Sequence, residues 1–283
     1  MKVKSILILF ILLLAFWQCS ENNTTEPFLG ISTPSEGSIK LILIDSPSTL
    51  DSVIICVSRV EVHSDGTDST QGSWTVINNS LRYFDLLLLQ NGASAVLGDT
   101  SLPAGKYTQI RLIVEDSNYV IDNGIKHHLT IPSGTQTGIK LNHSFEIESG
   151  NLYELYLDFN VDKSINITGN GAYKLKPTIR VVPVVISGSI SGQVLPLDTN
   201  PVIWTIVGTD TVSTFTDVNG LFKLMALLQG TYDVHIVPAD TIMYRDTTIT
   251  DVSVVANQNK DIGIVTLEER WQLVEDLLIE QSS

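Results

Sequence analysis

The chain has 283 residues, of which 17 are basic and 31 are acidic, and its formal net charge is −14. This acidity argues against nucleic acid and bare anionic membrane surfaces as partners. The length suits two domains, each large enough to bury its own core. Only 17% of the residues are charged, strand-forming and turn-forming residues dominate, and helical periodicity is scarce, which favours an all-β fold.

The first 19 residues have the pattern of a secretory leader. Lys2 and Lys4 precede an apolar run from Ile6 to Trp17, and Cys19 follows that run. The run is too short to cross a bilayer comfortably, but it fits the apolar region of a signal peptide. The position of Cys19 resembles the lipobox of bacterial lipoproteins. This resemblance implies that Cys19 takes a diacylglyceryl group and becomes the first mature residue, which would anchor the chain to a membrane.

Residues 20–36 are polar and rich in Ser, Thr, Asn and Pro, as expected of a flexible tether. The sequence therefore predicts an exported protein of the cell envelope that is lipid-anchored to the outer membrane. The alternative is an ordinary leader with an incidental cysteine, in which case the protein is secreted.

Residues 37–185 form the first predicted domain, in which short apolar runs alternate with turn residues at spacings typical of a β-sandwich. Cys56 lies in one of these runs and has no partner for a disulfide if Cys19 is lipidated, so we interpret it as a small buried core residue. The predicted strands cover residues 38–45, 53–63, 73–77, 82–88, 107–115, 126–132, 138–147, 152–161 and 173–186.

The strand predicted at 152–161 alternates between apolar and polar residues. Its apolar face, with Tyr153, Leu155, Leu157, Phe159 and Val161, is predicted to be core, and its polar face to be solvated. The polar face contains Asp158, Asn160 and Asp162, a spacing that begins a calcium loop. The sixth and twelfth positions of such a loop hold Lys163 and Gly169 here, which does not fit an EF-hand.

No metal, cofactor or catalytic signature stands out. His127 and His128 are neighbours on a predicted strand and point to opposite faces, so a zinc site would need His143 or His63 to approach one of them in the fold. The motifs of nucleophile elbows, zinc proteases and phosphate loops are absent from the sequence. We therefore expect a protein that is not an enzyme, with no catalytic residue, no metal site and no cofactor, and with ligand-binding residues unknown.

Seven phrases between residues 37 and 184 resemble the bacterial envelope family known as domain of unknown function 4382. The resemblance implies an exported β domain of unassigned activity and transfers no site residue. The phrases, in chain order, are GSIKLILIDSP, VIICVSRVEV, FDLLLL with QNG after it, LPAGKYTQIRL, TIPSGTQTGIKL, LYLDFNVDKSI and YKLKPTIRV.

Residues 186–267 resemble the carboxypeptidase regulatory-like, or prealbumin-like, sandwich, which has Greek-key topology and is generally a non-catalytic accessory. The phrases that carry the resemblance are GSISGQVLP, TFTDVNGLFKLMALLQGTYDVHIV and NKDIGIVTL. Asp217, Asn219 and Gly220 predict the turn of a hairpin, and Phe222 and Leu224 share one face of the strand that follows. From Ile186 onward there are 4 basic and 13 acidic residues, which indicates either simple solubility or a surface that attracts cations or a basic partner.

Residues 268–283 are predicted to form one short amphipathic helix. Thr266 and Glu269 have capping-box spacing, and Trp271, Val274 and Leu278 follow at helical spacing. Such a helix packs back on a sandwich or docks a partner.

The chain also repeats a short pattern, Leu102 with Gly105 and Tyr107, and Leu227 with Gly230 and Tyr232. We interpret it as a folding signal at the beginning of a strand in each of two sandwich domains. Without a bulge near Thr108, alternation would turn the two tyrosines to opposite kinds of face.

These observations favour a non-enzymatic envelope lipoprotein that acts as a binding or structural module for a protein or glycan partner. A carbohydrate-binding surface protein that uses Trp74, Trp204 and tyrosines is the first alternative. An enzyme with a dispersed, motif-free site is the second.

Overall fold

The computed structural model describes residues 35–65, 73–132 and 138–270, which belong to one compact unit. Regular structure in these ranges is almost entirely β-strand, arranged as two β-sandwich domains, and the predicted all-β class is confirmed. Among the helices in these ranges, none is both long and apolar enough to span a membrane.

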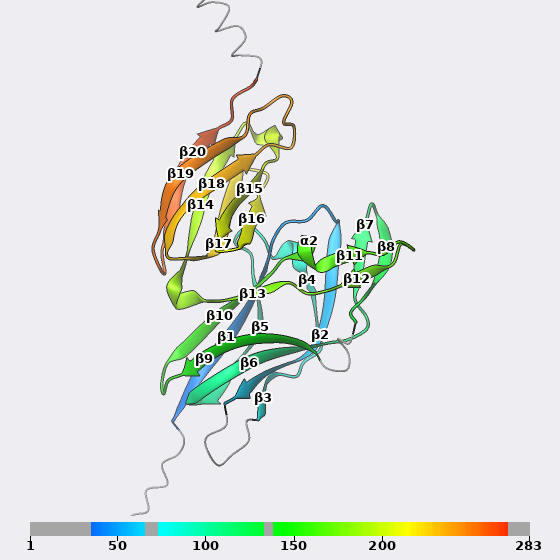
Figure 1. Cartoon of the computed structure of the whole chain (residues 1–283), viewed down its shortest axis with the longest axis vertical. Helices are drawn as coiled ribbons and strands as arrows, with labels where there is room; N and C mark the ends of the chain where they lie inside the picture. The colour runs from blue at the N-terminus through cyan, green and yellow to red at the C-terminus, as the bar shows by residue number, and fades with distance from the viewer. Residues whose placement is uncertain (1–34, 66–72, 133–137, 271–283) are drawn as a thin grey trace, which may run out of the picture. The chain divides into compact units, whose positions relative to one another are not determined.

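The first sandwich contains thirteen strands, which form two sheets (Figure 1). One sheet has the order β13-β10-β1-β5; the other has the order β11-β12-β8-β7-β2-β6-β9, with β3 and β4 also paired to β2. The strands are β1 (Glu36–Asp45), β2 (Ser52–Ser64), β3 (Trp74–Asn78), β4 (Arg82–Asp85), β5 (Ala95–Pro103), β6 (Gly105–Val114), β7 (Tyr119–Asp122), β8 (Ile125–Thr130), β9 (Ile139–Ile147), β10 (Leu152–Phe159), β11 (Ile165–Ile167), β12 (Tyr173–Leu175) and β13 (Ile179–Pro183).

The core of the first sandwich follows from the two-residue period of its strands. In β10, Leu155, Leu157 and Phe159 are fully buried, as the alternation predicts. The strand ends there, because the side chain of Asn160 accepts a hydrogen bond from the main-chain N of Lys163 and caps the short helix α2 (Val161–Ser164). The three polar residues of the calcium-like spacing therefore do not share one strand face.

Several predicted strands have different limits in the structure. The segment predicted at 82–88 ends in a 3₁₀ turn, η1 (Leu86–Leu88). The single strand predicted at 173–186 is wrong, because this segment forms two strands of different sheets, β12 and β13, and ends in a 3₁₀ turn, η2 (Val184–Ile186). Strands β5, β7 and β11 were not predicted. In β5, Gly98 weakens the strand pattern, but a Cβ at this position would lie 2.8 Å from Ile77 Cγ2, so close packing requires the glycine.

The second sandwich contains two further sheets, β17-β14-β20 and β16-β15-β18-β19 (Figure 1). A separate apolar core, which includes Ile190, Ile203, Phe222, Val234 and Ile236, is buried in this sandwich. The strands are β14 (Ser187–Leu195), β15 (Val202–Val207), β16 (Asp210–Phe215), β17 (Leu221–Leu228), β18 (Gly230–Val237), β19 (Thr247–Val254) and β20 (Asn259–Thr266), and a 3₁₀ turn, η3 (Leu197–Thr199), follows β14.

The sequence predicts a hairpin at Asp217, and the pairing of the two strands that this prediction implies is wrong. The turn itself forms, because Asp217 Oδ1 accepts hydrogen bonds from the main-chain N atoms of Asn219 and Leu221. The strands on either side of it, β16 and β17, belong to different sheets, so the turn is an arch between sheets. Phe222 and Leu224 are both buried in the core, as predicted.

The predicted start of the terminal helix is also wrong. Glu269 forms an isolated β-bridge with Tyr244, and the main-chain N of Arg245 donates a hydrogen bond to the carbonyl O of Glu268. Because Thr266 is the last residue of β20 and Glu269 lies in this bridge, the two residues do not form a capping box. Residues 271–283, where the rest of the helix was predicted, lie outside the described residues, as do residues 1–34 with Cys19.

Candidate binding surface

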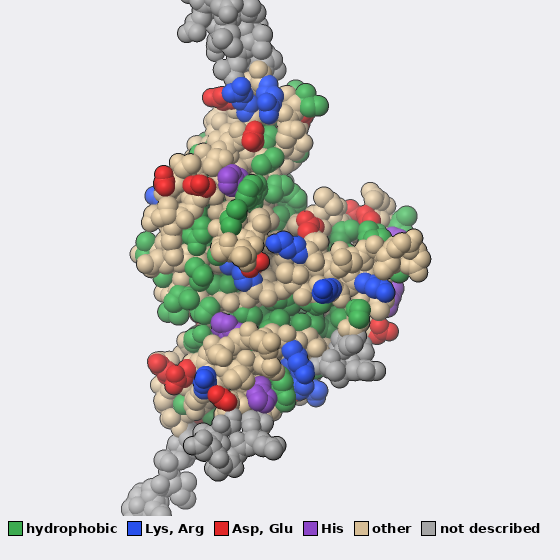
Figure 2. All heavy atoms as spheres, in the orientation of Figure 1, with side chains coloured by type: hydrophobic (Ala, Val, Ile, Leu, Met, Phe, Trp, Pro, Cys, Tyr) green, Lys and Arg blue, Asp and Glu red, His purple; other side chains and the backbone are tan. Residues whose placement is uncertain are grey.

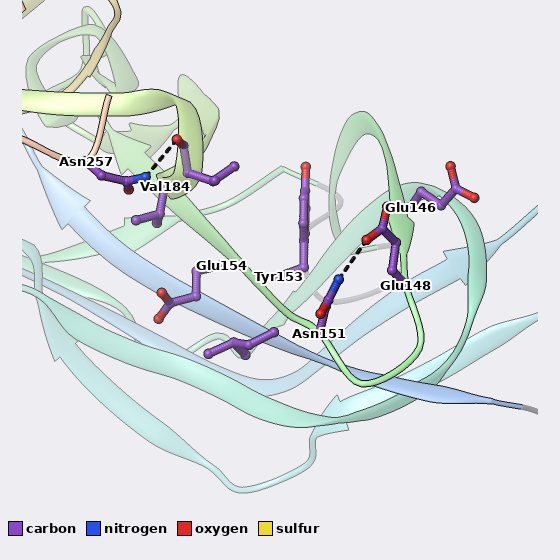
Figure 3. A pocket seen from close by; sticks show the side chains of 9 residues that line it. Glu146, Glu148, Asn151, Tyr153, Glu154, Val184 and Asn257 are labelled. Carbon is purple, nitrogen blue, oxygen red and sulfur yellow. Dashed lines mark hydrogen bonds between the residues drawn. The ribbon is translucent and has the colours of Figure 1, made fainter. Parts of the chain in front are cut away.

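A cavity of about 590 Å³, here called the glutamate pocket, lies at the ends of β9 and β10 and beside η2. Its lining combines carboxylates, amides, one tyrosine and apolar side chains. They are Glu146, Glu148, Asn151, Leu152, Tyr153, Glu154, Val184, Val185 and Asn257. Figure 3 shows Tyr153 standing between Glu154 on one side and Asn151 with Glu148 on the other.

The glutamates of the pocket are held apart from one another. Glu154 binds the ammonium group of Lys40 at 3.1 Å. Glu148 accepts a hydrogen bond from Asn151 Nδ2 at 2.7 Å, and Figure 3 shows the Glu146 carboxylate pointing away from Tyr153. Glu154 and Glu148 thus each have a polar partner of their own in the pocket.

Tyr153 is fixed by a stack of aromatic rings that joins the pocket to the core. The ring centroids of Tyr107 and Phe145 are 5.3 Å apart with an interplanar angle of 11°, and those of Phe145 and Tyr153 are 5.4 Å apart at 8°. Burial raises the pKa of both tyrosines and lowers the pKa of His143, whose ring lies 6.3 Å from that of Phe145. The stack therefore holds the Tyr153 ring in place against the core, and burial favours the neutral forms of both tyrosines and of His143.

The rim of the pocket exposes apolar side chains next to the carboxylates. Leu152 and Val185 are each more than half exposed, at 57% and 59%. On the face shown in Figure 2, acidic and basic side chains are interspersed with apolar and uncharged ones. The pocket differs from that mixture because its charged lining residues are all acidic.

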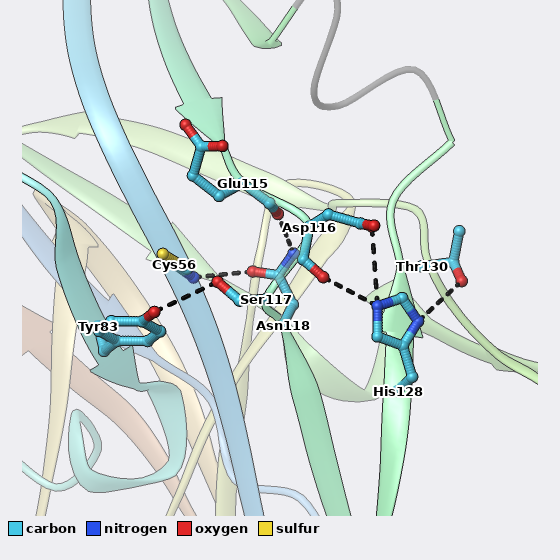
Figure 4. Close-up of polar contacts among 8 residues, drawn as sticks. All are labelled: Cys56, Tyr83, Glu115, Asp116, Ser117, Asn118, His128 and Thr130. Atoms are coloured by element: carbon cyan, nitrogen blue, oxygen red, sulfur yellow. Dashed lines mark hydrogen bonds and ion pairs between the residues drawn. The ribbon is translucent and has the colours of Figure 1, made fainter.

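A second polar cluster surrounds Cys56 and has a structural explanation (Figure 4). The buried side chain of Asn118 accepts a hydrogen bond from the main-chain N of Cys56 at 2.7 Å and donates one to the carbonyl O of Glu115. These two bonds fix the β6–β7 loop to β2. Cys56 is fully buried, as predicted, and burial of this kind is typical of a structural cysteine.

The histidines lie in separate surroundings. His128 Nε2 lies 3.7 Å from Asp116 Oδ1, and the ring of His127 stacks on Tyr173 at 4.6 Å. His63 contacts Trp74 edge-on, and the ring of His143 lies 6.3 Å from that of Phe145. Within residues 35–65, 73–132 and 138–270, three or more His, Cys, Asp or Glu side chains do not gather in a group able to hold a metal ion.

The two tryptophans named as sugar-binding candidates each pack against a neighbouring side chain. The guanidinium of Arg111 lies 3.9 Å from the ring centroid of Trp74, and the ring of His235 lies 3.9 Å from that of Trp204. They belong to β3 and β15, which are strands of different sandwiches. Trp74 and Trp204 therefore do not form the flat row of exposed rings that would suit a glycan chain.

The polar face of β10 was predicted to be solvated, and the burial of Asp158 shows that this prediction is wrong for Asp158. It is only 8% exposed, and its Oδ2 binds Arg180 Nη2 at 2.6 Å. Alternation along the strand placed Asp158 correctly on the face opposite Leu157. It did not show that the apolar residues Ile44, Val182 and Ala226 gather into a further buried cluster outside the two main cores.

Comparison with known proteins yields structures and one family. None of the curated proteins matches the chain. A type II cohesin–X-dockerin complex from Acetivibrio cellulolyticus is 24% identical over 28% of this chain and 56% of that chain, with a TM-score of 0.23. The chain thus spans little more than half the length of that relative.

Two pilins match more of the chain at lower identity. The minor pilin GBS52 of Streptococcus agalactiae is 11% identical over 81% of this chain and 95% of that chain, with a TM-score of 0.23. The shaft pilin SpaA of Lactobacillus rhamnosus GG is 8% identical over 83% and 97%, with a TM-score of 0.25. Residues 36–177, half of the chain, match the family described as Domain of unknown function (DUF4382), and the chain belongs to this family.

Proposed function

We propose that this protein is a non-enzymatic lipoprotein of the cell envelope that is anchored to the outer membrane through Cys19 and binds a protein partner at the glutamate pocket. The observation that carries the binding role is the lining of the pocket, in which acidic side chains adjoin exposed Leu152 and Val185. A lining of this kind suits a partner segment that presents a basic side chain next to an apolar one.

The fixed position of the Tyr153 ring supports a binding role. Because Tyr153 is held by the stack with Phe145 and Tyr107, a ligand does not have to order this ring when it binds. Asn151 and Asn257 add amide groups that can hydrogen-bond to a main chain.

A binding role fits the carboxylates better than catalysis does. Lys40 neutralises Glu154, and Asn151 satisfies one oxygen of Glu148. Such a site attracts a cationic group but offers no free pair of groups to exchange a proton with a substrate. The carbohydrate-binding alternative receives less support, because Trp74 and Trp204 each have a neighbouring side chain against the ring.

The anchor is tested by metabolic labelling with an alkyne fatty acid. We expect label on the wild-type chain and none on Cys19→Ala, which lacks the acceptor thiol. A wild-type chain without label would refute the lipid anchor, and the chain would then be exported without one.

The binding site is tested by placing a photo-crosslinking amino acid at Leu152 in intact cells. The matched control carries the same group at Val218, which is 89% exposed and does not line the pocket. We expect a discrete crosslinked protein at position 152 and none at 218. Glu146→Lys with Glu148→Lys should lower the yield at 152 by about tenfold, whereas Glu115→Lys should not change it.

Equal crosslinking at positions 152 and 218, or a yield unaffected by the charge reversals, would refute binding at the pocket. A glycan array that gives a signal lost in Trp204→Ala would instead favour the carbohydrate-binding alternative.

A further inference from the structure

Two buried oxygen atoms lack a hydrogen-bond partner and belong to side chains that line one small cavity. They are Asp45 Oδ2 and Gln90 Oε1. The cavity has a volume of about 20 Å³, which accommodates one particle the size of a water molecule. Asp158 lines the same cavity. This cavity is separate from the glutamate pocket and shares no residue with it.

The surrounding contacts fix both side chains. Asp45 ends β1, where its main-chain N donates a hydrogen bond to the carbonyl O of Leu89, and its Oδ1 accepts one from the main-chain N of Val161. Gln90 Nε2 donates a hydrogen bond to the carbonyl O of Leu87 at 2.8 Å. Each side chain therefore uses one of its terminal atoms in the fold and leaves the other oxygen without a donor.

Three charged side chains line the cavity, namely Asp45, Asp158 and Lys223. Asp45 is 6% exposed and Asp158 is 8% exposed. Burial raises the pKa of Asp45 well above its ordinary value, and the negative charges of Asp158 and Asp162 raise it further. Arg180 neutralises Asp158, whose pKa is nevertheless raised by burial and by the charge of Asp210.

An uncompensated carboxylate in this position is costly, and the observed contacts do not remove the cost. Lys223 also lines the cavity, but the ion pairs of the described residues do not join it to Asp45 or Asp158. Asp45 and Gln90 both line this cavity, and their unpartnered carboxylate and amide oxygens are hard ligands of the kind that a hard cation prefers.

We propose that this cavity binds one hard metal cation, with Asp45 Oδ2 and Gln90 Oε1 as ligands and Asp158 as a nearby compensating charge. Calcium is the probe of choice, because it accepts carboxylate and amide oxygens in irregular geometry. Only two acidic side chains line the cavity, so other oxygens must complete the coordination and the affinity should be modest, with a Kd of about 0.1–1 mM as in extracellular modules.

This site departs from the expectation of no metal, and it is not the calcium loop that the sequence spacing suggested. Asn160, the middle residue of that spacing, uses its Oδ1 to cap α2. Asp45 comes from a strand more than a hundred residues earlier, and it reaches Asp158 because β1 pairs with β10 in parallel, with Ile44 opposite Asp158.

The test uses the full chain purified in detergent and stripped of metal with EDTA. Equilibrium dialysis against ⁴⁵Ca²⁺ should show one saturable site per chain, and 10 mM CaCl₂ should raise the Tm by about 3–10 °C. Asp45→Asn keeps the size of the side chain but removes its charge, and it should abolish both effects. The matched control Asp99→Asn removes an exposed carboxylate of β5 and should keep both.

Three outcomes would overturn the proposal. The first is the absence of saturable calcium binding to the wild-type chain. The second is a Tm rise of equal size in Asp45→Asn, which would mean that calcium binds elsewhere on the acidic surface. The third is a metal-independent gain in Tm between pH 7 and pH 5 that Asp45→Asn lacks, which would show that Asp45 holds a proton instead of a cation.

Discussion

The turn at Leu102–Tyr107 and the turn at Leu227–Tyr232 use the same residue pattern in the two sandwiches. In both turns the leucine is fully buried, and the tyrosine hydroxyl donates a hydrogen bond to the main-chain carbonyl four residues earlier. Tyr107 Oη lies 2.9 Å from Pro103 O, and Tyr232 Oη lies 2.6 Å from Leu228 O. Each tyrosine thus closes the turn from which its own strand begins, in the manner of the tyrosine corners of β-sandwiches.

The difference between the turns lies in what each tyrosine packs against. Tyr107 is 2% exposed and stacks on Phe145, whereas Tyr232 is only partly buried at the edge of its core. The same local hydrogen bond is therefore combined with a large core contact in one sandwich and with a small one in the other. A shared sequence pattern defines the turn, while the surrounding sheet decides how much stability the turn contributes.

The comparison predicts its largest effect for removal of the ring. Tyr107→Ala should lower the free energy of unfolding by about 3–5 kcal/mol, the usual cost of truncating a buried aromatic residue. Tyr232→Ala should cost about 1–2 kcal/mol, because less of its ring is buried. Urea denaturation of both variants checks the order, and equal losses would contradict the difference in packing.

The second-largest difference in stability is expected when the glycine of each turn is replaced by alanine. Gly105 has φ +146°, a backbone conformation that side chains other than glycine rarely adopt, whereas Gly230 is not in the positive-φ region. Gly105→Ala should therefore cost about 1–3 kcal/mol, and Gly230→Ala should stay within about 0.5 kcal/mol. Thermal denaturation of the two variants measures this, and a tolerated alanine at 105 would show that the strain is absent.

Loss of the hydroxyl alone should have a smaller effect. Tyr107→Phe keeps the stack on Phe145 but leaves Pro103 O without its donor, which should cost about 1 kcal/mol. Tyr232→Phe should cost about half as much, because water can replace the hydroxyl at a partly exposed carbonyl. A larger loss for Tyr232→Phe than for Tyr107→Phe would mean that exposure does not decide the strength of this bond.

The smallest expected effect is a pH dependence of the stability. It involves only the first turn, where His143 lies beside the aromatic stack. Burial lowers the pKa of His143, so its neutral form is favoured in the fold. The stability that it contributes is complete above the unfolded-state pKa of about 6.5 and is lost as pH falls through the lower folded-state pKa. Urea denaturation between pH 7.5 and pH 5 should show this decline in the wild type and a shallower one in His143→Phe.

Local patterns predicted the features that depend on neighbours in sequence. Alternation placed Leu155, Leu157 and Phe159 in the core, and an apolar setting identified Cys56 as buried. The direction in which Tyr107 faces was predicted to depend on a bulge near Thr108, and the structure contains this bulge. β6 shifts its register against β9 between Tyr107 and Gln109, and this bulge turns Tyr107 into the core despite the polar residues that follow.

Features that depend on distant segments were missed. The burial of Asp158 needs β13 with Arg180 on one side and Ile44 of β1 on the other. The residues around Asp217 predict a hairpin where the structure has an arch, because local turn chemistry is the same whether the two strands pair or separate. The pocket walls were missed because Val185 and Asn257 approach Tyr153 only in the folded chain.

The parallel pairing of β1 with β10 has a mechanical consequence. Ser38 lies opposite Leu152, Asp45 lies opposite Phe159, and β5 pairs along the other edge of β1. A force that pulls the chain before Glu36 away from the chain after Phe159 acts along both strands in opposite directions. It therefore loads the hydrogen bonds between β1 and β10 together in shear and does not open them one at a time.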